Sequence, residues 1–331
     1  MTTRPRLTPA IAEVRSAVRA PLAPLGSARV LVALSGGSDS LALAAAVAFE
    51  AVRLPDVTAG AVIIDHALQD GSADVAARVA ATARQLGLDP IITTRVIVGT
   101  AGGPEAAARD ARYAALATVA TATSADLVLL GHTLDDQAES VLLGLGRGSG
   151  PGSVKGMAQR AGIYARPLLG IRRSMTEQFC IDSGLTPWHD PQNDDESFTR
   201  VRVRKTVLPM LERELGPGFA EALWRTASLV REDTEALDEF AEEQLEELAE
   251  PAEAGISLPV KALAANPPAL RQRIIRLTVS AEFGVSLSRA HTLEVSRLVT
   301  HWRGQDALDL PGIKVERLGG LLIFCSAPRE H

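Results

Sequence analysis

Cysteine is scarce in this chain of 331 residues, which contains only Cys180 and Cys325. Two thiols cannot build the disulfide framework of a small secreted domain, and no CxxC pair is present to bind zinc or an iron–sulfur cluster. We therefore expect a protein without cysteine chemistry.

Long apolar runs are missing as well. No stretch of about 18 uncharged apolar residues could span a bilayer, and the N-terminal residues lack the apolar core of a secretory signal. Hydrophobic residues make up 46% of the chain and charged residues 22%, as in ordinary globular proteins. We expect a folded cytoplasmic protein that has no membrane partner.

The net charge of −6 argues against a polyanionic partner, but the charges are unevenly distributed. Residues 231–253 contain eleven acidic side chains and one basic side chain, whereas every charged residue between Glu139 and Glu177 is basic. The latter are Arg147, Lys155, Arg160, Arg166, Arg172 and Arg173. Further basic runs are Arg200, Arg202, Arg204 and Lys205, and then Arg271, Arg273, Arg276, Arg289, Arg297 and Arg303. Local patches decide where a polyanion docks, although such arginines can also merely solvate helix faces.

Short apolar runs alternate with helical stretches in the first 170 residues, which predicts parallel βαβ units and a sheet covered by helices on both faces. The predicted strands are 30–34, 59–64, 91–98, 126–130 and 163–169. The predicted helices are an alanine-rich one that ends near residue 51, then 72–86 with Ser72 as N-cap, 105–121 and 134–145. The fold class is therefore α/β.

The pattern changes to long helices after about residue 215, where Pro217 and Gly218 mark a boundary. We predict helices over 219–248, 268–283 and 288–302, followed by a short β tail over 307–310 and 313–325. The expected domains are thus 1–215, carrying the parallel sheet, and 216–331, mainly helical.

The first chemical motif is Ser35-Gly36-Gly37-Ser38-Asp39-Ser40, between a predicted buried strand and a helix. The two glycines let backbone N–H groups approach an anion at the helix N-terminus, and Asp39 could hold Mg²⁺ against phosphate oxygens. No lysine follows, so the loop is not a Walker A motif. An ordinary strand–helix turn with a serine cap is the competing interpretation.

Gly131 to Glu139 begins where the fourth predicted strand ends, so it should face the same crevice. Its acidic side chains could simply complement the dipole of a helix start. Their position beside a phosphate loop favours binding of Mg²⁺ or an amine instead. Arg109 and Arg112 lie near another helix start, where cations are disfavoured, which hints at a nearby anion. The alternative is that both are surface arginines.

The Ser35–Ser40 loop resembles the SGGxDS signature of the N-type ATP pyrophosphatases, the PP-loop superfamily. Within that superfamily, the motifs taken together resemble the bacterial tRNA(Ile)-lysidine synthetases. The similarity covers roughly residues 28–210. The matching segments are Ser35–Ser40, Asp65-His66 with Leu68, Glu105 with Arg109, Arg112 and Tyr113, Gly131–Glu139, Arg147–Gly150, Arg166–Leu169, and Asp190 through Arg204. The departures are Ala67, Thr133, Ser140, Gln192, Phe198 and Val201, where the family usually has Gly, His, Thr, Ser, Tyr and Asn. The C-terminal part resembles the single helical domain of shorter members.

The resemblance implies an enzyme that uses ATP and Mg²⁺ to ligate L-lysine to C2 of the wobble cytidine in a CAU-anticodon isoleucine tRNA. It implies ATP binding by Ser35, Gly36, Gly37, Ser38, Asp39 and Ser40, with Asp39 as a Mg²⁺ ligand. The implied catalytic residues are Asp39, Arg109, Arg112, His132, Asp135, Asp136 and Glu139. The basic side chains expected to contact tRNA are Arg147, Lys155, Arg172, Arg173, Arg200, Arg204 and Lys205. A homodimer is a further hypothesis, and the division of roles among the carboxylates stays open.

Three other interpretations are compatible with parts of the sequence. A PP-loop enzyme of the 2-thiocytidine synthase type shares the two main motifs, but that type has CxxC cysteines, which are missing from this chain. A PP-loop amidotransferase or NAD synthetase would not need the basic runs or a second domain. An inactive nucleotide-binding module is the non-enzyme alternative, against which the intact Asp39, Arg112, Asp135 and Glu139 argue.

Overall fold

The computed structural model describes residues 7–66, 71–99, 103–148, 150–253 and 255–327. Ala67, Leu68 and Ser149, which belong to the family motifs, lie outside these ranges. The chain divides into two compact units, residues 1–228 and 229–331. The division at residue 215 that the sequence suggested stays a prediction. Among the described residues, no helix combines the length and apolar character needed to cross a membrane.

The first unit is built on a six-stranded sheet with the order β3-β2-β1-β4-β6-β5. The strands are β1 (Ala28–Ala33), β2 (Val57–Asp65), β3 (Ile91–Arg95), β4 (Leu127–Leu130), β5 (Arg160–Ala161) and β6 (Tyr164–Ala165). All neighbours pair in parallel except β5 and β6, which are antiparallel. The predicted α/β class is therefore confirmed.

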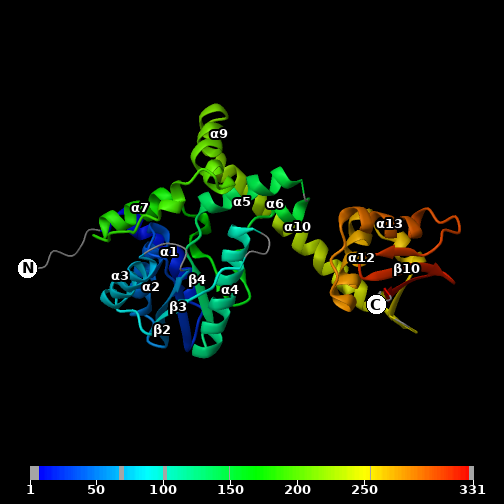
Figure 1. Cartoon of the computed structure of the whole chain (residues 1–331), viewed down its shortest axis with the longest axis horizontal. Coiled ribbons are helices and arrows are strands. Elements are labelled where there is room, and N and C mark those ends of the chain that lie inside the picture. The colour runs from blue at the N-terminus through cyan, green and yellow to red at the C-terminus, as the bar shows by residue number, and fades with distance from the viewer. Residues whose placement is uncertain (1–6, 67–70, 100–102, 149, 254, 328–331) are drawn as a thin grey trace, which may run out of the picture. The chain divides into compact units, whose positions relative to one another are not determined.

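Helices cover both faces of this sheet (Figure 1). The helices of this unit are α1 (Pro9–Leu22), α2 (Ser38–Ala51), α3 (Ser72–Gln85), α4 (Pro104–Thr123), α5 (Leu134–Arg147), α6 (Pro151–Val154), α7 (Arg173–Asp182), α8 (Thr199–Arg202) and α9 (Leu208–Glu214). Two 3₁₀ helices (Pro167–Gly170 and Pro191–Asp194) and a π-helix (Val203–Val207) lie between them. Side chains of β1 alternate between the faces: Val30 and Val32 pack in the cluster formed with α1, α2 and α3, and Leu31 packs against α4.

Two local predictions were wrong. The strand expected over 163–169 consists only of Tyr164–Ala165, and a 3₁₀ helix begins at Pro167. Proline has no N–H to donate to a ladder and suits the first turn of a helix, so the strand cannot continue. The N-cap of α3 is Gly71 rather than Ser72, with a left-handed φ of 81° that a serine would adopt only with strain.

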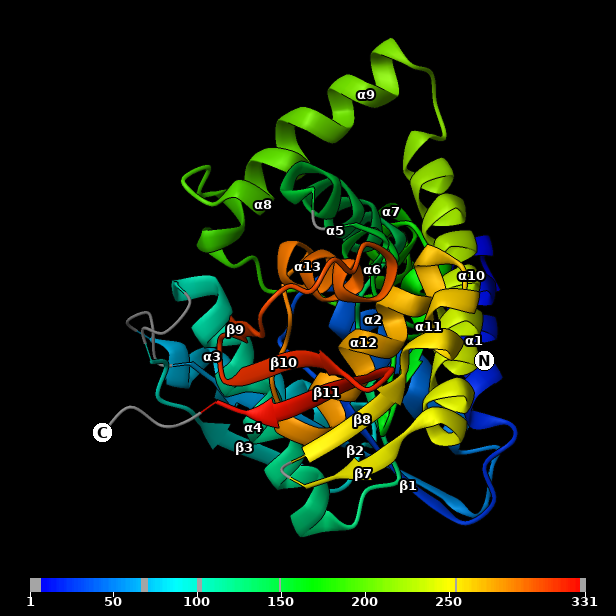
Figure 2. The same cartoon turned by 90° about the vertical axis from the view of Figure 1, so that its right-hand side faces the viewer.

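The second unit has its own core, formed around a five-stranded antiparallel sheet of order β7-β8-β11-β10-β9 (Figure 2). The strands are β7 (Glu250–Ala252), β8 (Gly255–Pro259), β9 (Leu308–Leu310), β10 (Ile313–Leu318) and β11 (Leu321–Ser326). The helices are α11 (Val260–Ala265), α12 (Pro268–Phe283) and α13 (Arg289–Thr300), and α10 (Phe219–Leu248) contributes to both units. The predicted β tail is thus part of a larger sheet, because β8 pairs with the distant β11.

Candidate functional site

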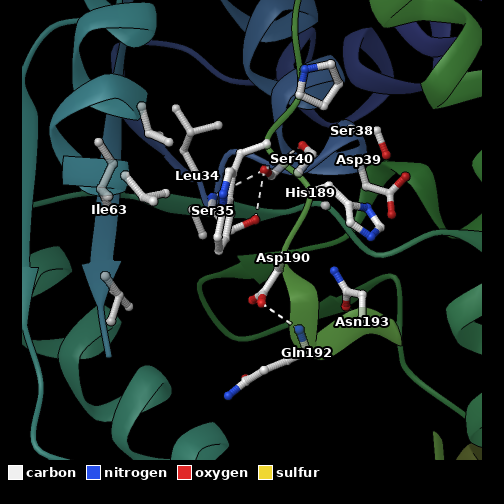
Figure 3. A pocket seen from close by; sticks show the side chains of 18 of the residues that line it. Leu34, Ser35, Ser38, Asp39, Ser40, Ile63, His189, Asp190, Gln192 and Asn193 are labelled. Carbon is white, nitrogen blue, oxygen red and sulfur yellow. Dashed lines mark hydrogen bonds between the residues drawn. The ribbon is translucent and has the colours of Figure 1, made fainter. Parts of the chain in front are cut away.

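A pocket of about 1060 Å³ opens at the carboxyl ends of β1, β2 and β4. It is lined by the residues at which these strands end, Ala33, Asp65 and Leu130. Parallel sheets bind ligands at this edge. Both predicted motifs contribute to the lining, and the 3₁₀ segment with Asp190 and Asn193 borders the same space (Figure 3).

The Ser35–Ser40 loop connects β1 to α2 and holds its own shape through Ser40. The Ser40 hydroxyl accepts hydrogen bonds from the backbone N–H groups of Ser35 and Gly36, each with a donor–acceptor distance of 3.2 Å (Figure 3). Gly36 has a φ of 91°, and a Cβ there would lie 2.6 Å from a methyl group of Val79. Glycine is therefore required at this turn, while the first turn of α2 keeps N–H groups without intrahelical partners.

The second motif packs directly on this loop. A Cβ on Gly131 would lie 3.0 Å from the backbone N and Cα atoms of Ser40, a tighter contact than almost all Cβ atoms make, so glycine is favoured at this close approach. Thr133 then caps α5, and Asp136 completes a capping box by accepting the N–H of Thr133 over 2.9 Å. The sequence motif is therefore a strand end, a contact with the phosphate loop and a helix start in succession.

Three predicted catalytic carboxylates surround Arg173, the first residue of α7. Its guanidinium lies 3.2 Å from Asp39, 2.8 Å from Asp136 and 3.4 Å from Glu139. Burial alone would raise the pKa of Asp136, but Arg173 and Arg200 outweigh it and hold that pKa well below its usual range. For Asp39 burial dominates, and it raises the pKa to about 6 despite Arg173.

Glu139 is the most deeply buried of these acids, with a side chain that is 0% exposed. It pairs with Arg173, with Arg200 over 2.8 Å and with Arg204 over 2.7 Å. Arg200 lies on α8 and Arg204 on the π-helix, a helix type that often marks functional sites. Three arginines that the sequence suggested as tRNA contacts thus meet one internal carboxylate.

Arg112 and Arg109 occupy different environments although both belong to α4. Arg112 lines the pocket, and within the described chain it forms no ion pair. Burial lowers its pKa from the ordinary value, and the neighbouring cations Arg109 and Arg200 add to this, although nearby Tyr113 and Asp136 oppose it. Arg109 is exposed and does not line the pocket. Its guanidinium carbon lies 5.0 Å from the centre of the Tyr113 ring.

Two histidines that line the pocket, His66 and His132, each have a buried Nδ1 atom with no hydrogen-bond partner among the described residues. Burial lowers the pKa of His132 to about 3, with Arg112 contributing. Burial and Arg112 also lower the pKa of His66. Both rings are therefore neutral near pH 7 and offer polar nitrogens to a ligand.

The remaining predicted residues lie around this centre. Asp135 does not line the pocket; it accepts the backbone N–H of Arg173 over 2.7 Å and pairs with Arg172. Lys205 lines the pocket and pairs with Asp194 over 2.5 Å. Arg147 is exposed at the end of α5, and Lys155 is half-buried after α6.

Sequence reasoning missed two neighbours of the phosphate loop. The Thr176 hydroxyl donates a hydrogen bond to Asp39, and the backbone N–H of Trp188 donates to the Gly36 carbonyl over 2.9 Å. Both residues come from segments more than 130 residues further along the chain. No local pattern marks them, so only the folded chain identifies them.

Comparisons with known proteins agree with this geometry. Residues 11–211 match the PP-loop domain, and residues 258–322 match the TilS substrate binding domain. The structure is similar to that of the U34-tRNA thiolase NcsA from Methanococcus maripaludis, with a TM-score of 0.57 and 18% identity over 67% of this chain and 80% of that chain. At this identity the similarity concerns the fold alone.

Relatives of similar length are much closer in sequence. The tRNA(Ile)-lysidine synthase of Leifsonia xyli subsp. xyli is 61% identical over 305 residues, which cover 92% of this chain and 91% of that protein. The enzyme of the same name from Thermobifida fusca is 51% identical over 96% of this chain and 98% of its own length. With these identities and a PP-loop domain over residues 11–211, the chain belongs to the tRNA(Ile)-lysidine synthase family of PP-loop enzymes.

Proposed function

We propose that this protein ligates L-lysine to C2 of the wobble cytidine in an isoleucine tRNA with the anticodon CAU, converting ATP to AMP and pyrophosphate. The observation that carries the proposal is the 61% identity to a tRNA(Ile)-lysidine synthase over 92% of the chain. The pocket supports it, because a phosphate loop, carboxylates and an arginine with no ion pair among the described residues meet there.

ATP binding is assigned to the Ser35–Ser40 loop. The N–H groups in the first turn of α2 and the hydroxyls of Ser35 and Ser38 can donate hydrogen bonds to phosphate oxygens, and the helix dipole favours the negative charge. Ser40 instead maintains the loop through its backbone hydrogen bonds.

The residues at the loop fit a Mg²⁺ ion that is shared with phosphates. No group of three or more metal-binding side chains occurs in the described part of the chain. Mg²⁺ usually binds through one or two carboxylates together with substrate phosphates, and Asp39 supplies such a carboxylate at the pocket. Bound there, the ion would offset negative charge on the pyrophosphate leaving group.

In the first step, the cytidine O2 attacks the α-phosphorus, and the bond to the oxygen that bridges the α- and β-phosphates breaks. Pyrophosphate leaves and an adenylated cytidine remains. Negative charge gathers on the α-phosphate in the transition state, where a positioned cation is most effective. Arg112 is suited to this role, because it lines the pocket and has no ion-pair partner within the described residues.

In the second step, the ε-amine of lysine attacks C2, and AMP leaves with the former O2 of the base. The amine has a reference pKa of about 10.4 and must lose a proton before it attacks. Of Asp135, Asp136 and Glu139, only Asp136 lines the pocket. We therefore assign the binding of the lysine amine to Asp136.

The proposal is tested by incorporation of labelled lysine into a CAU-anticodon isoleucine tRNA transcript with ATP and Mg²⁺. Methionine tRNA, which has the same anticodon, is the matched control. We expect incorporation into the isoleucine tRNA alone. ATP cleavage to AMP and pyrophosphate with another acceptor, and no lysine incorporation, would reject lysidine formation and leave the ATP chemistry standing.

A thiolation reaction like that named for the solved neighbour fits less well. That protein contains a [4Fe–4S] cluster, and such clusters are held by cysteine thiolates, typically four. This chain has two cysteines, Cys180 in the first unit and Cys325 in the second. Cys180 is buried, and burial raises the pKa of its thiol to about 12, which disfavours the reactive thiolate.

A further inference from the structure

We propose that Arg173 is a positioning residue: its guanidinium is the shared counter-ion that holds Asp39, Asp136 and Glu139 in one arrangement. This inference rests on the proposed function and adds a role for a residue outside the family motifs described above. It also replaces the expectation that Arg173 contacts tRNA.

The three carboxylates come from two different elements, Asp39 from α2 and the other two from α5. Each accepts a hydrogen bond from a different guanidinium nitrogen of Arg173: Asp39 from Nε, Glu139 from Nη1 and Asp136 from Nη2. One planar group therefore spans the phosphate loop and the helix that carries the second motif. Arg200 and Arg204 also pair with Asp136 and Glu139, but among the described residues only Arg173 joins Asp39 to these two carboxylates.

Arg173 is itself held in place from both sides. Its backbone N–H donates to Asp135 over 2.7 Å, and Thr176, one turn later on α7, donates to Asp39. The Arg173 side chain is only 18% exposed. A side chain fixed in this way is suited to pre-organise the carboxylates.

The choice of arginine has a chemical reason. Its guanidinium presents donors in a rigid planar fork, whereas a lysine ammonium is a compact point charge on a flexible stem. A lysine at position 173 could keep the charge but could not reach three carboxylates with fixed geometry. The charge and the geometry can therefore be separated by experiment.

The test compares Arg173→Met and Arg173→Lys with the wild-type protein, measuring kcat for lysidine formation and the Kd for tRNA at several salt concentrations. We expect Arg173→Met to lower kcat by about 100-fold, the loss typical of misplaced catalytic groups. Arg173→Lys should recover part of this loss. The Kd for tRNA and its salt dependence should stay unchanged in both variants.

Arg84→Ala is the control for an exposed cation outside the pocket, in the last turn of α3; it should leave kcat unchanged. A further check is the double variant Glu139→Gln with Arg173→Met. If the two residues act as one unit, the double variant loses no more activity than the worse single variant, because effects within a unit are not additive.

The proposal is overturned if Arg173→Met weakens tRNA binding and its salt dependence while kcat at saturating tRNA is kept. If Arg173→Met does not fold, as judged by circular dichroism and thermal melting, the decision rests on Arg173→Lys. A kcat of this variant equal to that of the wild-type protein would reject the positioning role. Wild-type protein that makes no lysidine would reject the proposed function instead, and ATP cleavage and ATP affinity of the same variants would then measure the role of Arg173.

Discussion

At the scale of single residues, position in the fold separates side chains that look equivalent in the sequence. Arg109 and Arg112 are one turn apart on α4, and the sequence suggested both as catalytic residues near a bound anion. Only Arg112 lines the pocket, while Arg109 is exposed beside the Tyr113 ring. Tyr113 in turn accepts a hydrogen bond from the buried Arg166 at 3.0 Å, which ties the middle of α4, next to Arg112, to Arg166.

We predict that Arg112→Ala lowers kcat for lysidine formation by about 1,000-fold, because an arginine that stabilises a phosphoryl-transfer transition state has an effect of this size. The matched control Arg109→Ala should change kcat by less than about 3-fold, as expected of an exposed side chain outside the site. Single-turnover measurement of pyrophosphate release tests both. Equal losses in the two variants, or full activity of Arg112→Ala, would contradict the assignment.

At the scale of elements, the first helix is attached to the rest of the unit by a buried acid. Glu50 on α2 is 2% exposed and accepts hydrogen bonds from Arg15 and Arg19 of α1, at 3.2 Å and 2.9 Å. Burial alone would raise the pKa of Glu50, but the two arginines outweigh it and lower that pKa from its ordinary value of 4.5. The sequence did not predict α1, whose packing depends on this distant partner.

We predict that Glu50→Gln lowers the free energy of unfolding of the first unit by about 3 kcal/mol, the cost of breaking a buried ion pair. Because the folded-state pKa of Glu50 is lowered, its contribution is present above pH 4.5 and is lost as the pH falls through the folded-state pKa. The difference between wild type and variant should therefore shrink below pH 4.5. Urea denaturation at several pH values measures it, with the exposed Glu13→Gln as control. A difference that does not change with pH would argue against the ion pair.

At the scale of the whole molecule, the uneven charge distribution is the property that concerns tRNA. The net charge is −6, yet the acidic residues concentrate on α10 and the basic residues in other segments. Several arginines near the pocket are paired internally and so add little to an external positive surface. We therefore expect phosphate contacts to come mainly from other basic side chains.

We predict that the affinity for isoleucine tRNA falls steeply as the salt concentration rises. The logarithm of the association constant should decline linearly with the logarithm of the salt concentration, because each contact to a phosphate releases counterions from the tRNA. Charge reversal on the exposed face of α10, Glu242→Lys with Glu246→Lys, should change the Kd by less than about 3-fold, since distant charges are screened over about 10 Å. Filter binding between low and high salt tests this. A salt-independent Kd would exclude phosphate contacts, and a large effect of the reversal would place α10 at the tRNA.

The sequence by itself determined the features that depend on neighbours in the chain. Periodicity predicted the parallel sheet and both ends of α10, and the order of short motifs indicated the family. The tertiary structure alone decided which side chains meet: Arg200 and Arg204 reach Glu139 across 61 and 65 positions, and Thr176 reaches Asp39 across 137. The reason is physical, because the local sequence pattern indicates the backbone conformation and the apolar face of each helix or strand. The partner of a buried charge is chosen by the packing of elements that are far apart in the chain.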